Sequence, residues 1–554
     1  MKRRVSVPET DSGTSPDSAG TRPGSTPAPA PADGAGGADH ETLAADALAV
    51  LQPGFPGTTA PDWLLRLLEQ GLTAVGLFAR NIASPEQLAA LTAQLRRARP
   101  EILVAVDEEG GDVTRLESRT GSSYPGNHAL GAVDDPALTR AVAHELGRRL
   151  AACGVNLNWA PSADVNCNPD NPVIGVRSFG ADPALVARHT VAYVEGMQAA
   201  GVAACTKHFP GHGDTAVDSH HALPRIDVPL DLLRSRELVP FRAAVAAGTR
   251  CVMSAHILVP ALDADRPATL SPAALTRLLR APREEGGLGF DGLVVTDGME
   301  MRAIADTWGI ARGSVLAIAA GADAICVGGG LADEATVVTL RDALVAAVRA
   351  GELPRERLAD AAARVRRLAR WARQAAPADA PQGQPGPAPG EGGVGLTAAR
   401  RALRVTAAGP YRPPTGPVHV AAFTPVANIA VGAETPWGLG PELARLLPGT
   451  SAARYDRDTA ADPASLAARV LAEAGGRRIV AVVRDVHRHA WMADALAALL
   501  AARPETVVVE MGLPGAPPAG ALHVATHGAA RVCARAAAEV VAGRAPTPTG
   551  PRGV

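Results

Sequence analysis

Short apolar runs alternate with longer helical segments over most of the first two thirds of the chain, and this alternation limits the possible folds. Seven runs recur, at LTAVGLF (72–78), ILVAVD (102–107), VNLNWAP (155–161), VAACTKHF (202–209), CVMSAH (251–256), LVVTD (293–297) and ADAICV (322–327). Continuous apolar strands between amphipathic helices predict a parallel sheet covered by helices. Seven strands favour an α/β fold of the TIM type, a (β/α)8-like barrel, over an open sheet. No eighth strand stands out, so the prediction includes an irregular barrel.

Two low-complexity segments divide the chain of 554 residues. Residues 1–40 predict a disordered tail, and the Pro- and Gly-rich residues 376–396 predict an exposed linker. The barrel is therefore expected in residues 41–375 and a second domain in residues 397–554. Four apolar runs predict that the second domain is a smaller α/β sandwich: VHVAAF (418–423), RIVAVVRD (478–485), TVVVEMGLP (506–514) and ALHVAT (521–526). It lacks a glycine-rich phosphate loop, so no nucleotide is expected.

Charge and hydropathy exclude several kinds of partner. A net charge of −2 with 20% charged residues gives no electrostatic reason to expect nucleic acid or an anionic membrane surface. No stretch reaches the ~18 apolar residues of a membrane span, and no apolar segment follows the initial MKRR as a signal peptide requires. We therefore expect no membrane and no nucleic-acid partner, a cytoplasmic location and a monomer.

The six cysteines lie 14 or more positions apart, so the chain has no CxxC motif. Three of them, Cys205, Cys251 and Cys326, fall in apolar runs, where a free thiol behaves as a small apolar side chain. We expect buried free thiols, which fits a reducing compartment better than a disulfide framework.

Polar residues gather at the ends of five of the seven barrel runs. They are Asp107, Asp164 shortly after the third run, Lys207 with His208, His256, and Asp297. Because the active site of such a barrel forms at the carboxyl ends of its strands, these side chains are expected to meet. Lys207 is one of only two lysines in a chain that otherwise uses arginine, which singles it out further.

The segment CTKHFPGHGDTAVDSHHALP (205–224) is the richest in titratable groups. His208 and His212 have the spacing of two ligands on one helix face, but the intervening Pro210 and Gly211 break a helix. A loop could still gather His208, Asp214 and His220 around zinc, although we expect no metal. Asp218 and His220 lie two positions apart, so the carboxylate can orient the ring and raise its pKa. Loop Asp and His also occur for plain turn reasons.

Three further motifs carry candidate residues. Asp297 in GLVVTDGMEM ends an apolar run, where a carboxylate is suited to act as a nucleophile or to cap the following helix. Asp107 in VAVDEEGGDVTRL precedes Gly110 and Gly111, and Arg115 can return toward it or form an ordinary loop ion pair. Arg177 in NPDNPVIGVRSFG follows a proline-rich loop and is weak evidence on its own.

Together, KHFPGHGDT with DSH, VAVDEEGG, NPVIGVRSFG and TDGMEM resemble glycoside hydrolase family 3, and within it the β-N-acetylglucosaminidase (β-hexosaminidase) branch, over residues 41–550. The resemblance implies a retaining double displacement on terminal β-linked N-acetylglucosamine of cell-wall muropeptides or chitin-derived fragments, without a cofactor or metal. Asp297 then matches the nucleophile, His220 the acid/base and Asp218 the residue that orients His220. The positions that match sugar-binding residues are Asp107, Arg115, Arg177, Lys207 and His208.

The sequence departs from the branch pattern beside the site and leaves alternatives open. Gly298, Met299 and Glu300 follow Asp297 where the branch more often has a small or acidic residue and then leucine. A β-glucosidase or β-xylosidase of the same family, a β-N-acetylglucosaminide phosphorylase, a metal-dependent hydrolase and a non-catalytic sugar-binding protein are the competing hypotheses. The Asp218–His220 pair within the barrel argues against the glucosidase and xylosidase hypotheses, because those enzymes usually take the acid/base from the second domain.

Overall fold

The computed structural model describes residues 33–218, 222–375, 393–426, 430–432 and 435–544. The chain divides into two compact units, residues 1–42 and 43–554. The first unit is described only from Asp33, where helix α1 (Asp33–Ala49) begins. The tail predicted for residues 1–40 was thus too long, because residues 33–40 are helical. Glycines 34, 36 and 37 are weak helix formers, which is why the sequence placed the start of this helix later.

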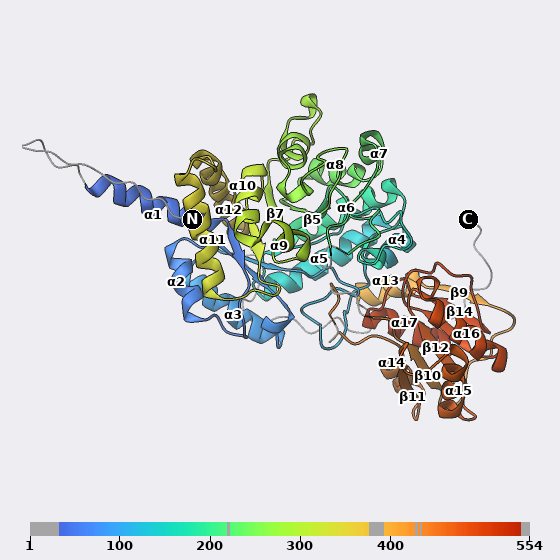
Figure 1. Cartoon of the computed structure of the whole chain (residues 1–554). Helices are drawn as coiled ribbons and strands as arrows, with labels where there is room; N and C mark the ends of the chain where they lie inside the picture. The colour runs from blue at the N-terminus through green and yellow to red at the C-terminus, as the bar shows by residue number, and fades with distance from the viewer. Residues whose placement is uncertain (1–32, 219–221, 376–392, 427–429, 433–434, 545–554) are drawn as a thin grey trace, which may run out of the picture. The chain divides into compact units, whose positions relative to one another are not determined.

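Eight parallel strands form the barrel in the second unit (Figure 1). They are β1 (Leu51–Pro53), β2 (Ala74–Leu77), β3 (Leu103–Val106), β4 (Leu157–Asn158), β5 (Ala203–Phe209), β6 (Cys251–Ser254), β7 (Leu293–Thr296) and β8 (Ile325–Val327). Strands β2 to β7 pair in sequence order and β1 pairs with β8. A bridge between Val295 and Ala324 connects β7 to the β8 segment. The predicted barrel is confirmed, and β1 is the strand that the sequence did not reveal.

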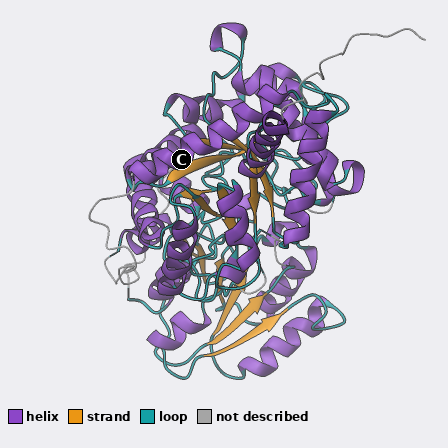
Figure 2. Cartoon of the chain, turned by 90° about the vertical axis from the view of Figure 1, so that its left-hand side faces the viewer, coloured by secondary structure: helices purple, strands orange, loops and turns teal. Residues whose placement is uncertain are grey.

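Helices surround these strands (Figure 2). They are α2 (Asp62–Gln70), α3 (Pro85–Ala98), α4 (Asn127–Val133), α5 (Pro136–Ala152), α6 (Pro183–Ala199), α7 (Leu230–Ser235), α8 (Leu238–Ala246), η4 (Ala273–Arg280), α9 (Arg302–Trp308), α10 (Ile310–Ala320), α11 (Glu334–Arg349) and α12 (Arg355–Ala375). Three of them begin at a Ser-Pro or Asp-Pro pair in which Ser84, Asp135 or Asp182 accepts a hydrogen bond from a backbone N–H of the first turn. Such a cap followed by proline is a favourable helix start, so the local sequence fixes where these helices begin.

The C-terminal part contains a six-stranded sheet in the order β11-β10-β12-β13-β14-β9. Its strands are β9 (Arg404–Ala407), β10 (His419–Phe423), β11 (Ser451–Tyr455), β12 (Ile479–Val483), β13 (Val507–Glu510) and β14 (Leu522–Ala525), of which only β9 runs antiparallel to its neighbour. The helices are α13 (Val394–Ala402), α14 (Gly440–Leu446), α15 (Pro463–Ala474), α16 (Ala490–Ala502) and α17 (Arg531–Val541). Apolar side chains of α14 and α17 pack on one face and those of α15 and α16 on the other. The predicted α/β sandwich is confirmed.

Helices α12 and α13 lie on either side of the predicted linker, whose residues 376–392 fall outside the described part of the chain. Helix α13 starts at Val394, before the predicted domain start at residue 397, and contributes Ala398 to the apolar core of the barrel. Its neighbours Leu396 and Ala399 pack with α17. Helix α13 therefore belongs to both cores, which a boundary drawn from composition does not capture.

The two parts also meet through Asp112, which follows strand β3. Its carboxylate accepts hydrogen bonds from the backbone N–H of Ala529, at 2.7 Å, and from Arg484. Gly111 allows the close turn before Asp112, because its φ is +63° and a Cβ there would lie 2.4 Å from Gly126 Cα. This turn places the C-terminal part beside the barrel loop that carries Arg115. In the described part of the chain, no helix has the length and hydropathy of a bilayer span.

Candidate active site

A cavity of about 530 Å³ opens at the carboxyl ends of the barrel strands. Six of the residues predicted from the sequence line it: Asp107, Arg115, Arg177, Lys207, His208 and Asp297. Trp159, Met253 and Phe78 add apolar surface between them. A mostly apolar cavity with a few convergent polar groups is the usual form of a small-molecule site.

A second cavity, of about 670 Å³, lies at the opposite ends of the strands, where Pro100, Asn156 and Gly201 precede β3, β4 and β5. None of the predicted site residues lines it. The larger volume therefore does not identify the site, and the charged groups place the chemistry in the cavity at the carboxyl ends.

Lys207 is the centre of a buried ionic network. Its ammonium lies 2.5 Å from a carboxylate oxygen of Asp107 and 2.7 Å from one of Glu109. Glu109 also binds Arg177, through Nη2 at 2.6 Å and Nε at 3.0 Å. The sequence did not single out Glu109, although it stands two positions after Asp107. In an extended chain these positions share a face, which was the available signal.

The pKa shifts in this network follow from the balance between burial and opposite charge. Burial alone would raise the pKa of Glu109, but Arg177 and Lys207 hold it well below its usual range. Burial would lower the pKa of Lys207 and of Arg177, yet the carboxylates nearby raise both. Glu109, Lys207 and Arg177 are therefore charged at neutral pH. Only Asp107 is substantially accessible, with 21% of its side chain exposed against 2% for Lys207.

Asp164 organises the histidines of the site. It is fully buried after β4, and Oδ2 lies 2.7 Å from Nδ1 of His208. Its Oδ1 accepts the backbone N–H of His212 at 2.6 Å. Burial would raise the pKa of Asp164, but His208 outweighs this effect and lowers it. Burial and the neighbouring His208 lower the pKa of His212 to about 4, so this ring is neutral at neutral pH.

Asp297 is fixed at the end of β7 by its backbone. Its N–H donates to the carbonyl oxygen of Ser254 at 3.1 Å, and its Oδ1 accepts the N–H of Gly298 at 2.8 Å. The next helix, α9, begins at Arg302 with Met301 at its cap position. Asp297 therefore does not cap that helix, which removes the structural alternative for this carboxylate. His256, predicted at the end of β6, binds Thr269 and the carbonyl oxygen of Gly298 and thus supports the same turn.

The predicted acid/base pair lies at the edge of the described residues. Asp218 is partly buried, and its carbonyl oxygen accepts the N–H of Ala222 at 3.2 Å. His220 lies outside the described residues, so its role stays a prediction. The alternative zinc site would comprise His208, Asp214 and His220. In the structure, Asp214 forms an ion pair with Arg236.

The C-terminal part contributes to the cavity wall. Arg115 lies 3.4 Å from Asp107 and donates to the carbonyl oxygen of Ala430 at 2.8 Å. Ala430 also lines the cavity. This contact could not be predicted from the sequence, because it joins segments more than 300 positions apart through a backbone atom.

Glu108 is buried against the segment that carries Arg115. Its raised pKa leads us to expect that the stability of the protein depends on pH. Its Oε2 accepts the backbone N–H of Arg115 at 2.7 Å and of Leu116 at 2.9 Å. Burial nevertheless raises its pKa from 4.5 to about 7. Because folding raises the pKa of Glu108, the folded protein favours the neutral carboxyl. The resulting contribution to the free energy of unfolding is fully present below the unfolded pKa. That contribution is lost as the pH rises through the folded pKa.

We therefore expect Glu108→Gln, which cannot ionise, to be more stable than wild type at pH 8 by up to roughly 3 kcal/mol. At pH 4.5 the two proteins are expected to differ little, since both carry a neutral side chain. Thermal unfolding of both proteins at the two pH values measures this difference. An equal difference in Tm at both pH values would contradict the assignment of the raised pKa to Glu108.

Three comparisons with known proteins bear on this site. The model of the glycosyl hydrolase family 3 N terminal domain matches residues 60–368, more than half of the chain. Beta-hexosaminidase A of Pseudoalteromonas piscicida is 34% identical over 336 residues, which are 56% of this chain and 55% of that protein. Beta-hexosaminidase LpqI of Mycobacterium tuberculosis is 40% identical over 255 residues, 46% of this chain and 64% of that protein. The chain thus spans less than two thirds of the length of these relatives.

Solved structures resemble nearly the whole chain. One of them is a glycoside hydrolase family 3 beta-N-acetylglucosaminidase from Paenibacillus sp. str. FPU-7, with a TM-score of 0.78 and 33% sequence identity. The similarity covers 91% of this chain and 97% of that one, so it includes both the barrel and the C-terminal sandwich.

Proposed function

The chain belongs to glycoside hydrolase family 3, and from this premise we propose that it is a retaining β-N-acetylglucosaminidase. Its substrate would be a terminal, non-reducing, β-linked N-acetylglucosamine. One observation carries the proposal: Asp297 lines the same cavity as Asp107, Arg115 and Lys207. A rigidly held carboxylate beside polar groups that suit sugar hydroxyls is the arrangement that glycoside hydrolysis requires.

In the proposed first step, Asp297 attacks the anomeric carbon as the bond to the leaving oxygen breaks. His220, in its protonated form, gives its proton to that oxygen, and Asp218 stabilises the imidazolium. The product is a glycosyl ester of Asp297. In the second step, neutral His220 takes a proton from water, whose oxygen displaces Asp297 from the anomeric carbon. Two inversions retain the β configuration, and His220 returns to its protonated form.

The side chains of the ionic network bind the hydroxyls of the sugar ring. Asp107 is the most exposed carboxylate of the network and can accept hydrogen bonds from adjacent hydroxyls. Lys207 uses two of its three donors on Asp107 and Glu109, which leaves one donor for a hydroxyl. A compact ammonium suits this crowded position better than a planar guanidinium, which is a reason for lysine in an arginine-rich chain. Arg177 is also buried, and its guanidinium holds Glu109 in place.

A comparison of aryl glycosides tests the proposal. The purified protein is expected to hydrolyse 4-nitrophenyl β-N-acetylglucosaminide with a kcat/KM about 10²-fold or more above that for the matching β-glucoside and β-xyloside, because a polar site penalises a missing partner. Preference for the glucoside or the xyloside would overturn the assignment to this branch. Binding of N-acetylglucosamine without turnover would instead favour a sugar-binding protein. Formation of sugar 1-phosphate in phosphate buffer would favour a phosphorylase.

The loss of kcat/KM in His220→Ala is expected to depend on the leaving group of the substrate. Loss of general acid catalysis should cost about 10²- to 10⁴-fold in kcat/KM with a poorly leaving sugar. With 2,4-dinitrophenol, which needs no proton to depart, the loss should be far smaller. Steady-state rates on both substrates measure the contrast, and His221→Ala is the matched control. Equal losses on both substrates would contradict the acid/base role of His220.

We further propose cell-wall muropeptides or chitin-derived fragments as natural substrates, with a role in peptidoglycan recycling and a cytoplasmic location. All six cysteines are free and five of them are buried, which supports a reducing compartment. The proposal includes a monomeric enzyme that needs neither nucleic acid nor membrane. Hydrolysis of purified muropeptides and of chitin oligosaccharides by the same preparation would rank the two substrate classes.

A further inference from the structure

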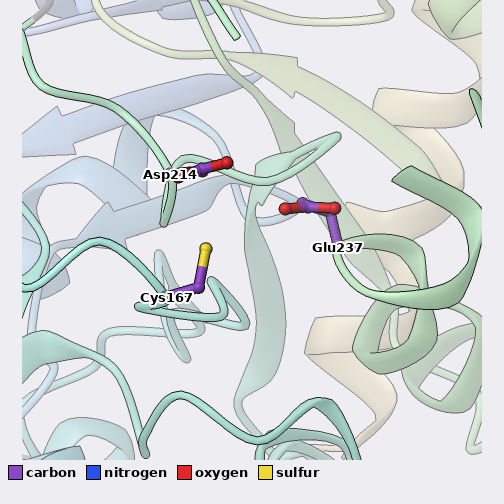
Figure 3. Close-up of side chains that lie close together, drawn as sticks. All are labelled: Cys167, Asp214 and Glu237. Carbon is purple, nitrogen blue, oxygen red and sulfur yellow. The ribbon is translucent and has the colours of Figure 1, made fainter. Parts of the chain in front are cut away.

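Three side chains of metal-binding type lie together outside the cavity of the active site. They are Cys167 in the segment after β4, Asp214 in the segment after β5, and Glu237 immediately before α8. One ligand atom of each lies within 4.8 Å of the other two. Figure 3 shows the sulfur and the two carboxylates turned toward the same space. From this arrangement we propose that the three residues bind one thiophilic divalent cation such as Zn²⁺.

Glu237 carries the observation that points to a ligand. The residue is 1% exposed, and its Oε1 accepts a hydrogen bond from Nε of Arg236 at 2.5 Å. Its Oε2 is buried and has no hydrogen-bond partner among the described residues. A buried carboxylate oxygen without a donor is costly, and in native proteins such an atom is commonly satisfied by an ion or a water molecule.

Arg236 binds the two carboxylates from outside the cluster, so it can hold them in place without taking the position of the ion. It binds Oδ2 of Asp214 and Oε1 of Glu237, each at 2.5 Å, and so leaves the second oxygen of each carboxylate for an ion. Ligating carboxylates in metal sites are usually held by hydrogen bonds of this kind. A thiolate and two carboxylates carry three negative charges, which a divalent cation and the guanidinium would balance. The Cys167 proton would leave to solvent when the ion binds.

The ligand set selects the kind of cation. One sulfur and two carboxylate oxygens, with water in the fourth position, suit the tetrahedral coordination of zinc. Mg²⁺ and Ca²⁺ prefer six or more oxygen ligands, so the thiolate and the small number of donors disfavour them. The sequence suggested a different set built on His208, and the Cys167 set escaped notice because its members are far apart along the chain.

The ion would connect two segments that form walls of the active site. Asp214 stands between His212, which lines the cavity, and Asp218. Cys167 precedes the cavity residues Val173 and Arg177 in its own segment. Glu237 lies directly under the first of these walls, since a Cβ at Gly211 would come within 2.8 Å of the Glu237 side chain. An ion held by all three would brace the segment that leads to the proposed acid/base pair.

Cadmium titration tests the site without any substrate, so the result does not depend on the proposed function. Full-length protein is freed of metal with a chelator, kept reduced, and titrated with CdCl₂ while the ultraviolet charge-transfer band of cadmium thiolate is recorded. Competition by ZnCl₂ then gives the affinity for zinc. The same titrations are run on Cys167→Ser, Glu237→Gln and Asp214→Asn, with Cys153→Ala as a cysteine control outside the cluster.

Wild type and Cys153→Ala are expected to bind one equivalent with the thiolate band. Cys167→Ser should lose the band, and Glu237→Gln and Asp214→Asn should bind zinc at least about tenfold more weakly. Asp214 is more exposed than Glu237, so its variant keeps the test valid if Glu237→Gln fails to fold. Absence of the band in wild type, or its persistence in Cys167→Ser, would overturn the proposal.

Discussion

Asp297→Asn is expected to lower kcat/KM on 4-nitrophenyl β-N-acetylglucosaminide by roughly 10⁴-fold or more, because a covalent mechanism has no substitute for its nucleophile. The side chain keeps its size and its hydrogen bond from Gly298, so the turn at the end of β7 should be retained. Substrate binding through Asp107 and Lys207 should persist. Steady-state kinetics with a binding measurement on the variant separate the two effects.

Asp291→Asn is the matched control for this prediction. Asp291 lies just before β7, the strand that Asp297 follows. Its side chain is 78% exposed, and its ion pair with Arg364 is at the surface. The control should keep nearly full activity. Azide provides a second check, since it can enter the space left in Asp297→Ala and should yield the α-glycosyl azide. Substantial hydrolysis by either Asp297 variant would remove Asp297 from the mechanism.

Glu109→Ala is expected to give the largest loss of stability. The change leaves Lys207 and Arg177 without their shared partner in a region where Glu109 and Arg177 are only 3% and 6% exposed. An unpaired buried charge costs about 3–5 kcal/mol, so Tm should fall by several degrees or more. Activity should also fall, because Lys207 and Arg177 lose the group that holds them beside the cavity.

Asp134→Asn is the control for Glu109→Ala. It removes a surface ion pair with Arg188, in which the side chains are 47% and 39% exposed. Exposed pairs contribute about 0–1 kcal/mol, so thermal unfolding should change little. A similar small change in Glu109→Ala would show that solvent or rearrangement compensates the buried charges, contrary to the network described above.

The parts of the fold that could be predicted are those with long apolar strands. Strands β3 and β7 are buried on both faces and appear in the sequence as nearly continuous apolar runs, and β5 begins as one before Thr206. Strand β1 has three residues, of which one is Gln52 and one is Pro53, so neither its length nor its composition reveals it. Strands β9 and β11 lie at sheet edges with exposed positions, and they lack the apolar signal for that reason.

A site residue could be predicted where its position follows from a nearby strand, and not where it depends on partners that are distant in the sequence. Asp107 and Asp297 follow apolar runs, so barrel geometry alone placed them at the same edge of the sheet. Glu109 was missed because its partners come from β5 and from the segment after β4, and no local pattern records those pairs. Ala430 was missed because only its backbone carbonyl takes part.

The central claim is that Asp297 becomes glycosylated, and trapping that ester tests it most directly. A 5-fluoro-N-acetylglucosaminyl fluoride forms the ester quickly, because fluoride leaves readily, and slows its hydrolysis. Trypsin then releases residues 284–302, EEGGLGFDGLVVTDGMEMR, for mass spectrometry. We expect this peptide to gain one fluorinated sugar, with fragment ions that place the sugar on Asp297 and leave Asp291 unmodified. Complete turnover inhibition with no label on this peptide, or a label on another residue, would contradict the account.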